Sequence, residues 1–211
     1  FVMAGCQSNP TGSSDAPAGS TGGESQSATN DPGDEGVINI GVALTITGAG
    51  AADGLNMLNA VEEVVKLQNA AGGVQGKQIK LNIQDTGNDT DTALNAINLL
   101  EKENLSAIIG PHGSGFIFAA QDIIENGKIP AIGGGTNYKL PSPENNYLFL
   151  GRPSDAIQAR AIAEYLINTV HSTSVGMLYV STDFGQGAYD VVKEIFDEHP
   201  EIEFVAEPHN E

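Results

Sequence analysis

The chain has 211 residues, of which 40% are hydrophobic, so it is long enough to bury the core of one large domain or of two small ones. Nine Lys and Arg residues stand against 27 Asp and Glu residues, which leaves a formal net charge of -18. This excess of acid excludes nucleic-acid binding, because contacts to phosphates require basic side chains that displace counterions. It also disfavours adsorption to anionic lipid, so attachment to a membrane requires a covalent anchor or a spanning helix, and no segment is apolar enough to span.

The single cysteine, Cys6, has to be interpreted from its surroundings. One cysteine excludes an internal disulfide and a cysteine-based metal cluster. Residues 1–6 read Phe-Val-Met-Ala-Gly-Cys, which is typical of the end of a secretory signal peptide with small residues before its cleavage point. The segment resembles a bacterial lipobox, which implies that Cys6 carries a diacylglycerol anchor. The alternative is an ordinary leader in which the cysteine is incidental.

Residues 7–36 predict a disordered tether. They are almost all Ser, Gly, Thr, Pro, Ala, Asn, Asp and Glu, with no aromatic and no basic side chain, so burial cannot offset the entropy lost on ordering. As a flexible coil, the segment would span about 30 Å root-mean-square. A tether of this length directly after Cys6 favours an extracytoplasmic protein that is lipid-anchored to the bacterial cell membrane.

The rest of the chain alternates between strand and helix patterns. Short apolar or alternating runs predict strands at 37–44, 79–83, 107–109, 129–132, 147–150 and 175–180. Apolar residues spaced at i, i+3 and i+4 predict helices with buried faces within 55–65, 93–100, 120–124, 161–170 and 191–195. Leu55, Val64, Ala161 and Tyr165 are among the residues placed on these faces. This alternation gives right-handed crossovers, so the predicted fold is a doubly wound α/β fold with a parallel sheet covered on both faces.

In such sheets ligands bind beyond the carboxyl ends of the strands, so the loops from strand into helix carry the candidate site. These loops are rich in Gly and in hydroxyl side chains. Ser114 lies where a strand turns into a helix, and its hydroxyl together with the first N–H groups of that helix predicts a site for a carboxylate. Ser114 is also a candidate N-cap. Thr136 is a second candidate donor, with a turn-stabilising role as the alternative.

Enzymatic interpretations of the same loops fail. Residues 48–54 imitate a dinucleotide fingerprint, but the third Gly is displaced by one, and Asp85 lies too far along the chain to bind a ribose. Residues 110–115 lack the Lys of a phosphate-binding loop, and the glycines beside Ser114 are its immediate neighbours, whereas a hydrolase nucleophile elbow has them two residues away on each side. His112 is more typical of a loop histidine than of a general base. The sequence therefore predicts no catalytic residue.

A calcium loop also fails. Asp85, Asn88, Asp89 and Asp91 have the right chemistry, but the Gly and the final Glu that such a loop requires are absent, which favours helix capping. The other histidines show no metal-ligand spacing. The sequence therefore predicts no metal site and no cofactor.

Taken together, residues 37–205 resemble the type I periplasmic-binding-protein superfamily, specifically the branch of Leu/Ile/Val-binding proteins of ABC importers. The resemblance rests on the order and spacing of four segments: 40–54, 69–74, 108–114 and 183–187. It implies a non-catalytic protein with two α/β lobes that close over a ligand. Residues 37–150 would form lobe one, and residues 151–211 the hinge crossover and the start of lobe two. The residues that bind the ligand's ammonium group would then follow Glu211.

The resemblance also implies which residues bind the ligand. Ser114, Gly135 and Thr136 match the carboxylate-binding elements of the family, and Gly113 lies in the same loop as Ser114. Phe184 matches an aromatic residue of the second lobe that closes over the ligand.

Asp53 departs from the family, whose members often have an aromatic residue at this position. A carboxylate there favours a ligand with an amino or other cationic group, with helix capping as the alternative. The implied function is the solute-binding subunit of an ABC importer, which binds an amino acid of the branched-chain type, or a similar small carboxylate or amide, and docks on an ABC permease. A sensor ectodomain of the same fold is the alternative.

Overall fold

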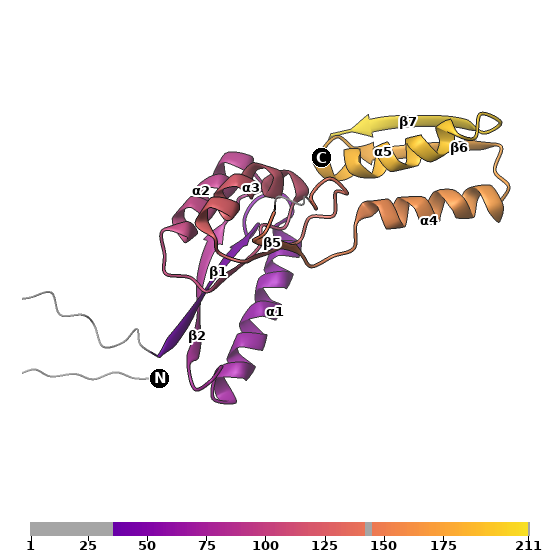
Figure 1. Cartoon of the computed structure of the whole chain (residues 1–211). Coiled ribbons are helices and arrows are strands. Elements are labelled where there is room, and N and C mark those ends of the chain that lie inside the picture. The colour runs from indigo at the N-terminus through magenta and orange to yellow at the C-terminus, as the bar shows by residue number, and fades with distance from the viewer. Residues whose placement is uncertain (1–35, 142–144, 211) are drawn as a thin grey trace, which may run out of the picture. The chain divides into compact units, whose positions relative to one another are not determined.

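The computed structural model describes residues 36–141 and 145–210 (Figure 1). Cys6, the predicted signal-peptide segment 1–6 and residues 7–35 of the predicted tether lie outside the described residues. Within the described part of the chain, no helix has both the length and the apolar composition needed to cross a bilayer.

Five parallel strands form the first sheet, in the order β2-β1-β3-β4-β5. Their bounds are β1 Val37–Leu44, β2 Gln78–Asp85, β3 Ala107–Ile109, β4 Ala131–Gly133 and β5 Leu148–Leu150. Because β2 and β3 are added on opposite sides of β1, the chain diverges between β1 and β3, where open α/β sheets form a ligand-binding crevice. The predicted doubly wound parallel sheet is confirmed.

Helices bury β1 on both faces of this sheet. α1 (Ala51–Ala70) packs on one face, and α2 (Thr90–Glu101) and α3 (Ser114–Gly127) pack on the other. Val42 of β1 belongs to the hydrophobic cluster of α1, whereas the next residue, Ala43, belongs to that of α2 and α3. Both are fully buried. An uninterrupted apolar strand is the expected consequence of this double cover, since side chains alternate between the faces.

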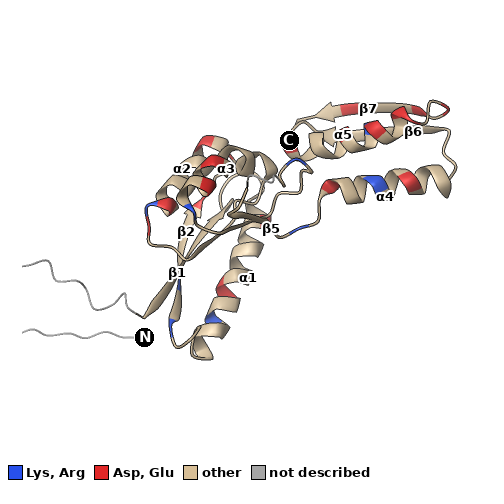
Figure 2. Cartoon of the chain, in the orientation of Figure 1, with Lys and Arg blue, Asp and Glu red and all other residues tan. Residues whose placement is uncertain are grey.

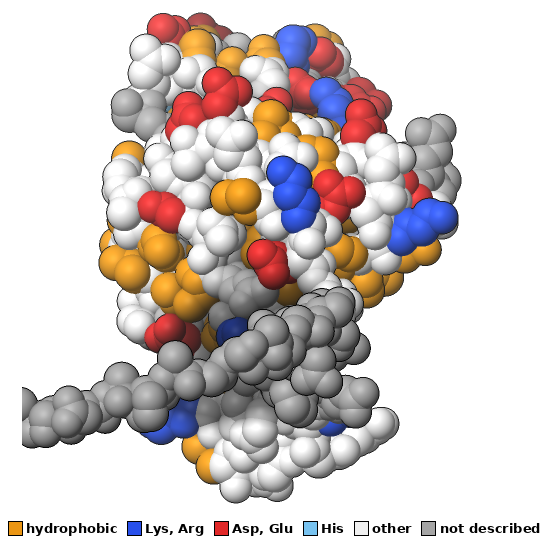
Figure 3. Space-filling view, turned by 90° about the vertical axis from the view of Figure 1, so that its left-hand side faces the viewer, with side chains coloured by type: hydrophobic (Ala, Val, Ile, Leu, Met, Phe, Trp, Pro, Cys, Tyr) orange, Lys and Arg blue, Asp and Glu red, His pale blue; other side chains and the backbone are white. Residues whose placement is uncertain are grey.

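The face that α1 covers becomes exposed toward the edge strand β5. The parallel register places Val42, Ile109, Ile132 and Phe149 in one row across the sheet. Val42 is fully buried, but Ile132 is 52% exposed and Phe149 is 55% exposed. Among the described residues, the predicted cover on both faces is therefore complete at β1 and incomplete at β4 and β5. Figure 3 shows hydrophobic side chains, in orange, at several places on one face of the molecule.

The C-terminal part of the described chain forms a second, two-stranded parallel sheet. β6 (Ser174–Val180) pairs with β7 (Glu203–His209). α4 (Asp155–Asn168) and α5 (Asp183–Asp197) share a hydrophobic core with this sheet. The division of the chain into two lobes at residue 150 stays a prediction.

β7 is absent from the sequence-based expectation. Its Glu203, Glu207 and Pro208 resemble a loop, because acidic residues and proline are depleted in strands. In the structure Pro208 lies opposite Tyr179 of β6, and Phe204 stacks on Phe196 of α5 with ring centroids 4.9 Å apart. The packing of Phe204 on α5 therefore stabilises a strand that the local sequence does not predict.

Two helices bury faces that differ from the predicted ones. In α4, Ala159 and Ala163 are buried, whereas the predicted Ala161 and Tyr165 are exposed. Ala159 and Ala163 belong to the hydrophobic core that α4 shares with α5, so contacts with α5 decide which face of α4 is buried.

α1 also buries a narrower face than its apolar pattern predicts. Leu58 and Gly54 are buried, but Leu55 and Val64 are exposed. A Cβ on Gly54 would lie 1.7 Å from the carbonyl oxygen of Thr45, so the helix touches the end of β1 with its backbone. Residues beside this narrow line of contact stay at the surface.

Leu99 and Leu100 offer a matched test of the first core. They are adjacent in α2, but Leu100 is fully buried and Leu99 is 50% exposed. We expect Leu100→Ala to lower the free energy of unfolding by about 2–5 kcal/mol, because it removes buried carbon atoms and leaves a cavity. Leu99→Ala should change it by about 0.5 kcal/mol or less. Urea denaturation followed by circular dichroism measures both, and equal effects would contradict this core.

Asp85 ties the loop after β1 to the end of β2. Its Oδ1 accepts hydrogen bonds from the backbone N–H groups of Ile46 and Gly87, each at 2.9 Å, and of Thr47 at 3.3 Å. Its Oδ2 accepts from the Thr47 hydroxyl. Burial raises the pKa of Asp85, but these hydrogen bonds outweigh it, so the pKa of this carboxyl lies below its usual value. Asp85 was considered from the sequence as a ribose or calcium ligand. In the structure it stabilises the loop after β1 instead.

This depressed pKa predicts a pH-dependent stability. The ionised carboxylate contributes stability that is present above the pKa of an unfolded aspartate and is lost as the pH falls through the lower folded value. Wild type should therefore be more stable than Asp85→Asn at pH 7, and the difference should shrink between about pH 5 and pH 2. Urea denaturation across this range measures it. A difference independent of pH would show that the charge of Asp85 does not stabilise the loop.

Candidate functional site

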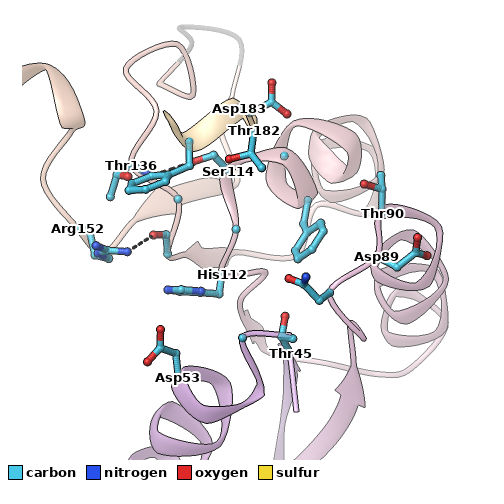
Figure 4. A pocket seen from close by; sticks show the side chains of 18 residues that line it. Thr45, Asp53, Asp89, Thr90, His112, Ser114, Thr136, Arg152, Thr182 and Asp183 are labelled. Carbon is cyan, nitrogen blue, oxygen red and sulfur yellow. Dashed lines mark hydrogen bonds between the residues drawn. The ribbon is translucent and has the colours of Figure 1, made fainter. Parts of the chain in front are cut away.

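A cavity of about 680 Å³ lies beyond the carboxyl ends of β1 and β3, where the chain diverges (Figure 4). Its volume is in the range of about 300–1,000 Å³ that is usual for small-molecule sites. All six residues assigned to ligand binding from the sequence line this cavity: Asp53, Gly113, Ser114, Gly135, Thr136 and Phe184. The structure therefore brings these residues together, and their roles in binding stay predictions.

Four helices begin in the wall of the cavity. Asp89 caps α2 by accepting a hydrogen bond from the N–H of Thr92. Gly50, Gly113 and Thr182 occupy the N-cap positions of α1, α3 and α5, and no side chain within the described ranges caps these three helices. The first N–H groups of a helix lack intrahelical partners and carry partial positive charge. The cavity is therefore suited to an anionic group despite the acidity of the chain.

Ser114 is the first residue of α3, and Gly113, not Ser114, holds the N-cap position. The N-cap role considered for Ser114 is therefore wrong. Its side chain is buried, and its Oγ accepts hydrogen bonds from the N–H groups of Thr136 at 3.2 Å and of Asn137 at 3.3 Å. Because both contacts use the oxygen as acceptor, the hydroxyl hydrogen stays available to donate to a ligand.

The loop after β4 is held by buried polar contacts. The Thr136 hydroxyl donates to Oδ2 of Asp155 at 2.9 Å, and the Asp155 N–H donates to the carbonyl of Thr136 at 2.8 Å. The hydroxyl hydrogen of Thr136 therefore points to Asp155, so a ligand carboxylate would have to displace that contact. A Cβ on Gly135 would lie 2.7 Å from Cδ1 of Ile117, which gives this glycine a packing role that is independent of any ligand.

The loop after β4 also contacts α5. The side-chain amide of Asn137 donates to the carbonyl of Asp183, and Lys139 forms an ion pair of 2.8 Å with Asp190. Phe184, in the first turn of α5, is about half exposed and lines the cavity. The loop after β4 of the first sheet and the first turn of α5, which packs on the second sheet, therefore contribute to one site.

Charged side chains gather on another wall of the cavity. Among the described Lys and Arg residues, coloured blue in Figure 2, only Arg152 lines it. Arg152 donates from Nη1 to the carbonyl of Gly134 at 3.3 Å. Burial lowers the pKa of the half-buried His112 and the charge of Arg152 lowers it further, while the Asp53 carboxylate partly opposes them. At neutral pH the His112 imidazole is therefore neutral.

Sequence reasoning missed Arg152, Asn137 and Asp155. Arg152 follows β5 in the same way that Ser114 follows β3, so the rule that ligands bind beyond strand ends applies to it as well. The same rule covers Asn137 in the loop after β4, although its partner lies 46 residues away in the sequence, whereas no comparable signal points to Asp155, whose partner lies 19 residues away.

The chemistry of the site does not resemble catalysis or metal binding. The Ser114 oxygen accepts from backbone N–H groups, and among the described residues no hydrogen bond joins it to a side-chain base. Across residues 36–141 and 145–210, no three His, Cys, Asp or Glu side chains are arranged to hold a metal ion.

Comparisons with known proteins agree on one family. Residues 37–209 match the family described as periplasmic binding protein. Leu/Ile/Val-binding protein homolog 2 of Brucella abortus is 30% identical over 162 residues, which cover 76% of this chain and 44% of that protein.

Solved structures have the same fold. The branched-chain amino acid transporter substrate-binding protein of Streptococcus pneumoniae, determined in complex with isoleucine, is 27% identical, with a TM-score of 0.73 over 82% of this chain and 50% of that chain. A type 1 periplasmic binding protein of Bordetella pertussis is 25% identical, with a TM-score of 0.75 over 83% of this chain and 49% of that chain.

The chain spans about half the length, or less, of the relatives it matches. The family consists of solute-binding proteins and not of enzymes, which agrees with the sequence-based prediction of no catalytic residue. The match extends through the five-stranded sheet and into β7. This chain therefore belongs to the periplasmic binding protein family, with the type I fold and a sequence similar to Leu/Ile/Val-binding proteins.

Proposed function

We propose that the chain is part of the extracytoplasmic solute-binding subunit of an ABC importer, and that its cavity binds an α-amino acid or a similar small carboxylate. The observation that carries this proposal is the position of Ser114. A buried hydroxyl with a free hydrogen lies at the uncapped N-terminus of α3, in the wall of a cavity of small-molecule size. Hydroxyl and backbone N–H groups at such a terminus are the donors that a carboxylate requires.

Closure around the ligand would couple binding to transport. Phe184 and the first turn of α5 line the same cavity as Ser114, and the Lys139–Asp190 pair joins the loop after β4 to α5. A ligand that touches both sides favours the closed arrangement by its differential affinity for it. The closed form would then dock on an ABC permease in the membrane. The names of the relatives support an amino acid as ligand.

Ser114→Ala tests the carboxylate assignment. We expect this variant of the full-length protein to lose about 1.5–3 kcal/mol of binding free energy for its amino acid, because a hydrogen bond to a charged group is removed. Isothermal titration calorimetry with L-leucine, L-isoleucine, L-glutamine and L-glutamate measures the loss.

Ser174→Ala is the matched control, because Ser174 is an exposed serine of β6 outside the cavity. Thermal unfolding of both variants without ligand separates lost binding from lost folding, since Ser114 also holds the loop after β4. Unchanged affinity in Ser114→Ala would overturn the assignment.

We also propose that Cys6 carries a diacylglycerol anchor, on the basis of the lipobox-like segment and the polar stretch that follows it. Cys6→Ala should move the protein from the membrane fraction to the soluble extracytoplasmic fraction, and it should abolish labelling by radioactive palmitate. Ser8→Ala, two residues beyond the cysteine, is the control and should stay at the membrane. Retention of palmitate by Cys6→Ala would contradict the anchor.

A further inference from the structure

Three side chains that take no part in the proposed carboxylate site gather on one wall of the cavity. Asp53 comes from the first turn of α1, His112 from the loop between β3 and α3, and Arg152 from the segment after β5. Gly134 links two of them, since the guanidinium donates to its carbonyl and a Cβ on it would lie 2.7 Å from Cδ2 of His112. Figure 4 shows Asp53 and Ser114 on opposite sides of the cavity.

The fold leaves most of the hydrogen-bonding capacity of this cluster unused. Arg152 donates one of its five N–H groups to Gly134, and within residues 36–141 and 145–210 the side chains of Asp53 and His112 make no hydrogen bond, although the two groups interact electrostatically. The cavity's other acidic residues lie elsewhere, because Asp89 caps α2 and Asp183 approaches Gly115 of α3. Asp53, His112 and Arg152 are therefore available to a ligand.

The cluster combines an acceptor with donors at close quarters. Asp53 only accepts, Arg152 only donates, and a neutral His112 imidazole does one of each. A ligand carboxylate here would meet the charge of Asp53, and a ligand ammonium would meet that of Arg152. An alkyl group would leave both charges without partners when the site closes, which is costly. A carboxamide satisfies both, because its NH₂ donates and its carbonyl accepts.

We propose that the ligand carries a carboxamide at the end away from its α-carboxylate, and that Asp53 and Arg152, beside His112, select it. This inference rests on the proposed function, because Ser114 and the N-terminus of α3 hold the other end of the ligand. It assigns the pocket to an amide side chain such as that of glutamine and away from a branched aliphatic one.

The test compares ligands of similar size in full-length protein. Isothermal titration calorimetry with L-glutamine, L-glutamate, L-lysine and L-leucine should rank L-glutamine first, by at least about tenfold, because a site built for polar groups rejects analogues that lack them. Asp53→Leu and Arg152→Leu should each remove that preference, by weakening L-glutamine binding at least about tenfold and leaving L-leucine unchanged or tighter.

Matched controls lie outside the cavity. Asp91→Leu in α2 and Arg160→Leu in α4 replace exposed residues of the same types and should keep the preference for L-glutamine. Asp53→Asn keeps the shape of the side chain, and its unfolding midpoint should match that of wild type. A weaker L-glutamine affinity in this variant then reports on the lost charge.

The outcomes separate this inference from the function on which it rests. Binding of L-leucine in preference to L-glutamine, with a loss in Ser114→Ala, would overturn the amide assignment and keep the solute-binding function. A preference for L-glutamate or L-lysine would overturn it in the same way. Binding of none of the four would overturn both.

Discussion

The structure depends on the burial of β1 between two layers of helices. Val42, Ala43 and Leu44 are fully buried, so successive side chains of this strand enter opposite cores. β1 also pairs with β2 on one edge and with β3 on the other, which directs the next crossovers to opposite sides. The loops after β1 and β3 are thereby separated, and the cavity forms between them. A hydrophobic constraint on one strand therefore decides where a polar site lies.

Polar contacts then give the cavity its shape. The Ser114 oxygen holds the loop after β4 through the N–H groups of Thr136 and Asn137, and Thr136 in turn holds Asp155 at the start of α4. These groups are buried, where an unpaired donor or acceptor is costly, so the network favours a single arrangement of the loop. No buried side-chain nitrogen or oxygen of the described residues lacks a partner. Gly113, Ser114 and Gly115, at the N-terminus of α3, line the cavity.

The net charge of the chain disfavours anions, whereas the local electrostatics of the cavity favour them. A charge of -18 suggests repulsion of anions, yet three helix termini without side-chain caps and Arg152 line the cavity. Fixed dipoles and single charges act over a few ångströms, whereas distant surface charges are screened by salt. Ligand choice is therefore set by the wall of the cavity. The Ser114 side of the cavity carries hydrogen-bond donors, whereas the Asp53 side carries both an acceptor and donors.

The alternation of apolar residues by itself determined the parallel sheet, its helices and the loops that carry the site, because period two and period 3.6 are local properties of the chain. It also placed Ser114 at a helix start beyond a strand. Only the tertiary structure decided which face of α4 is buried, that β7 is a strand, and that the Thr136 hydroxyl serves Asp155. Each of these depends on contacts between residues distant in the sequence, which no local pattern encodes. The same holds for Asp53 and Arg152, which only folding brings to one wall.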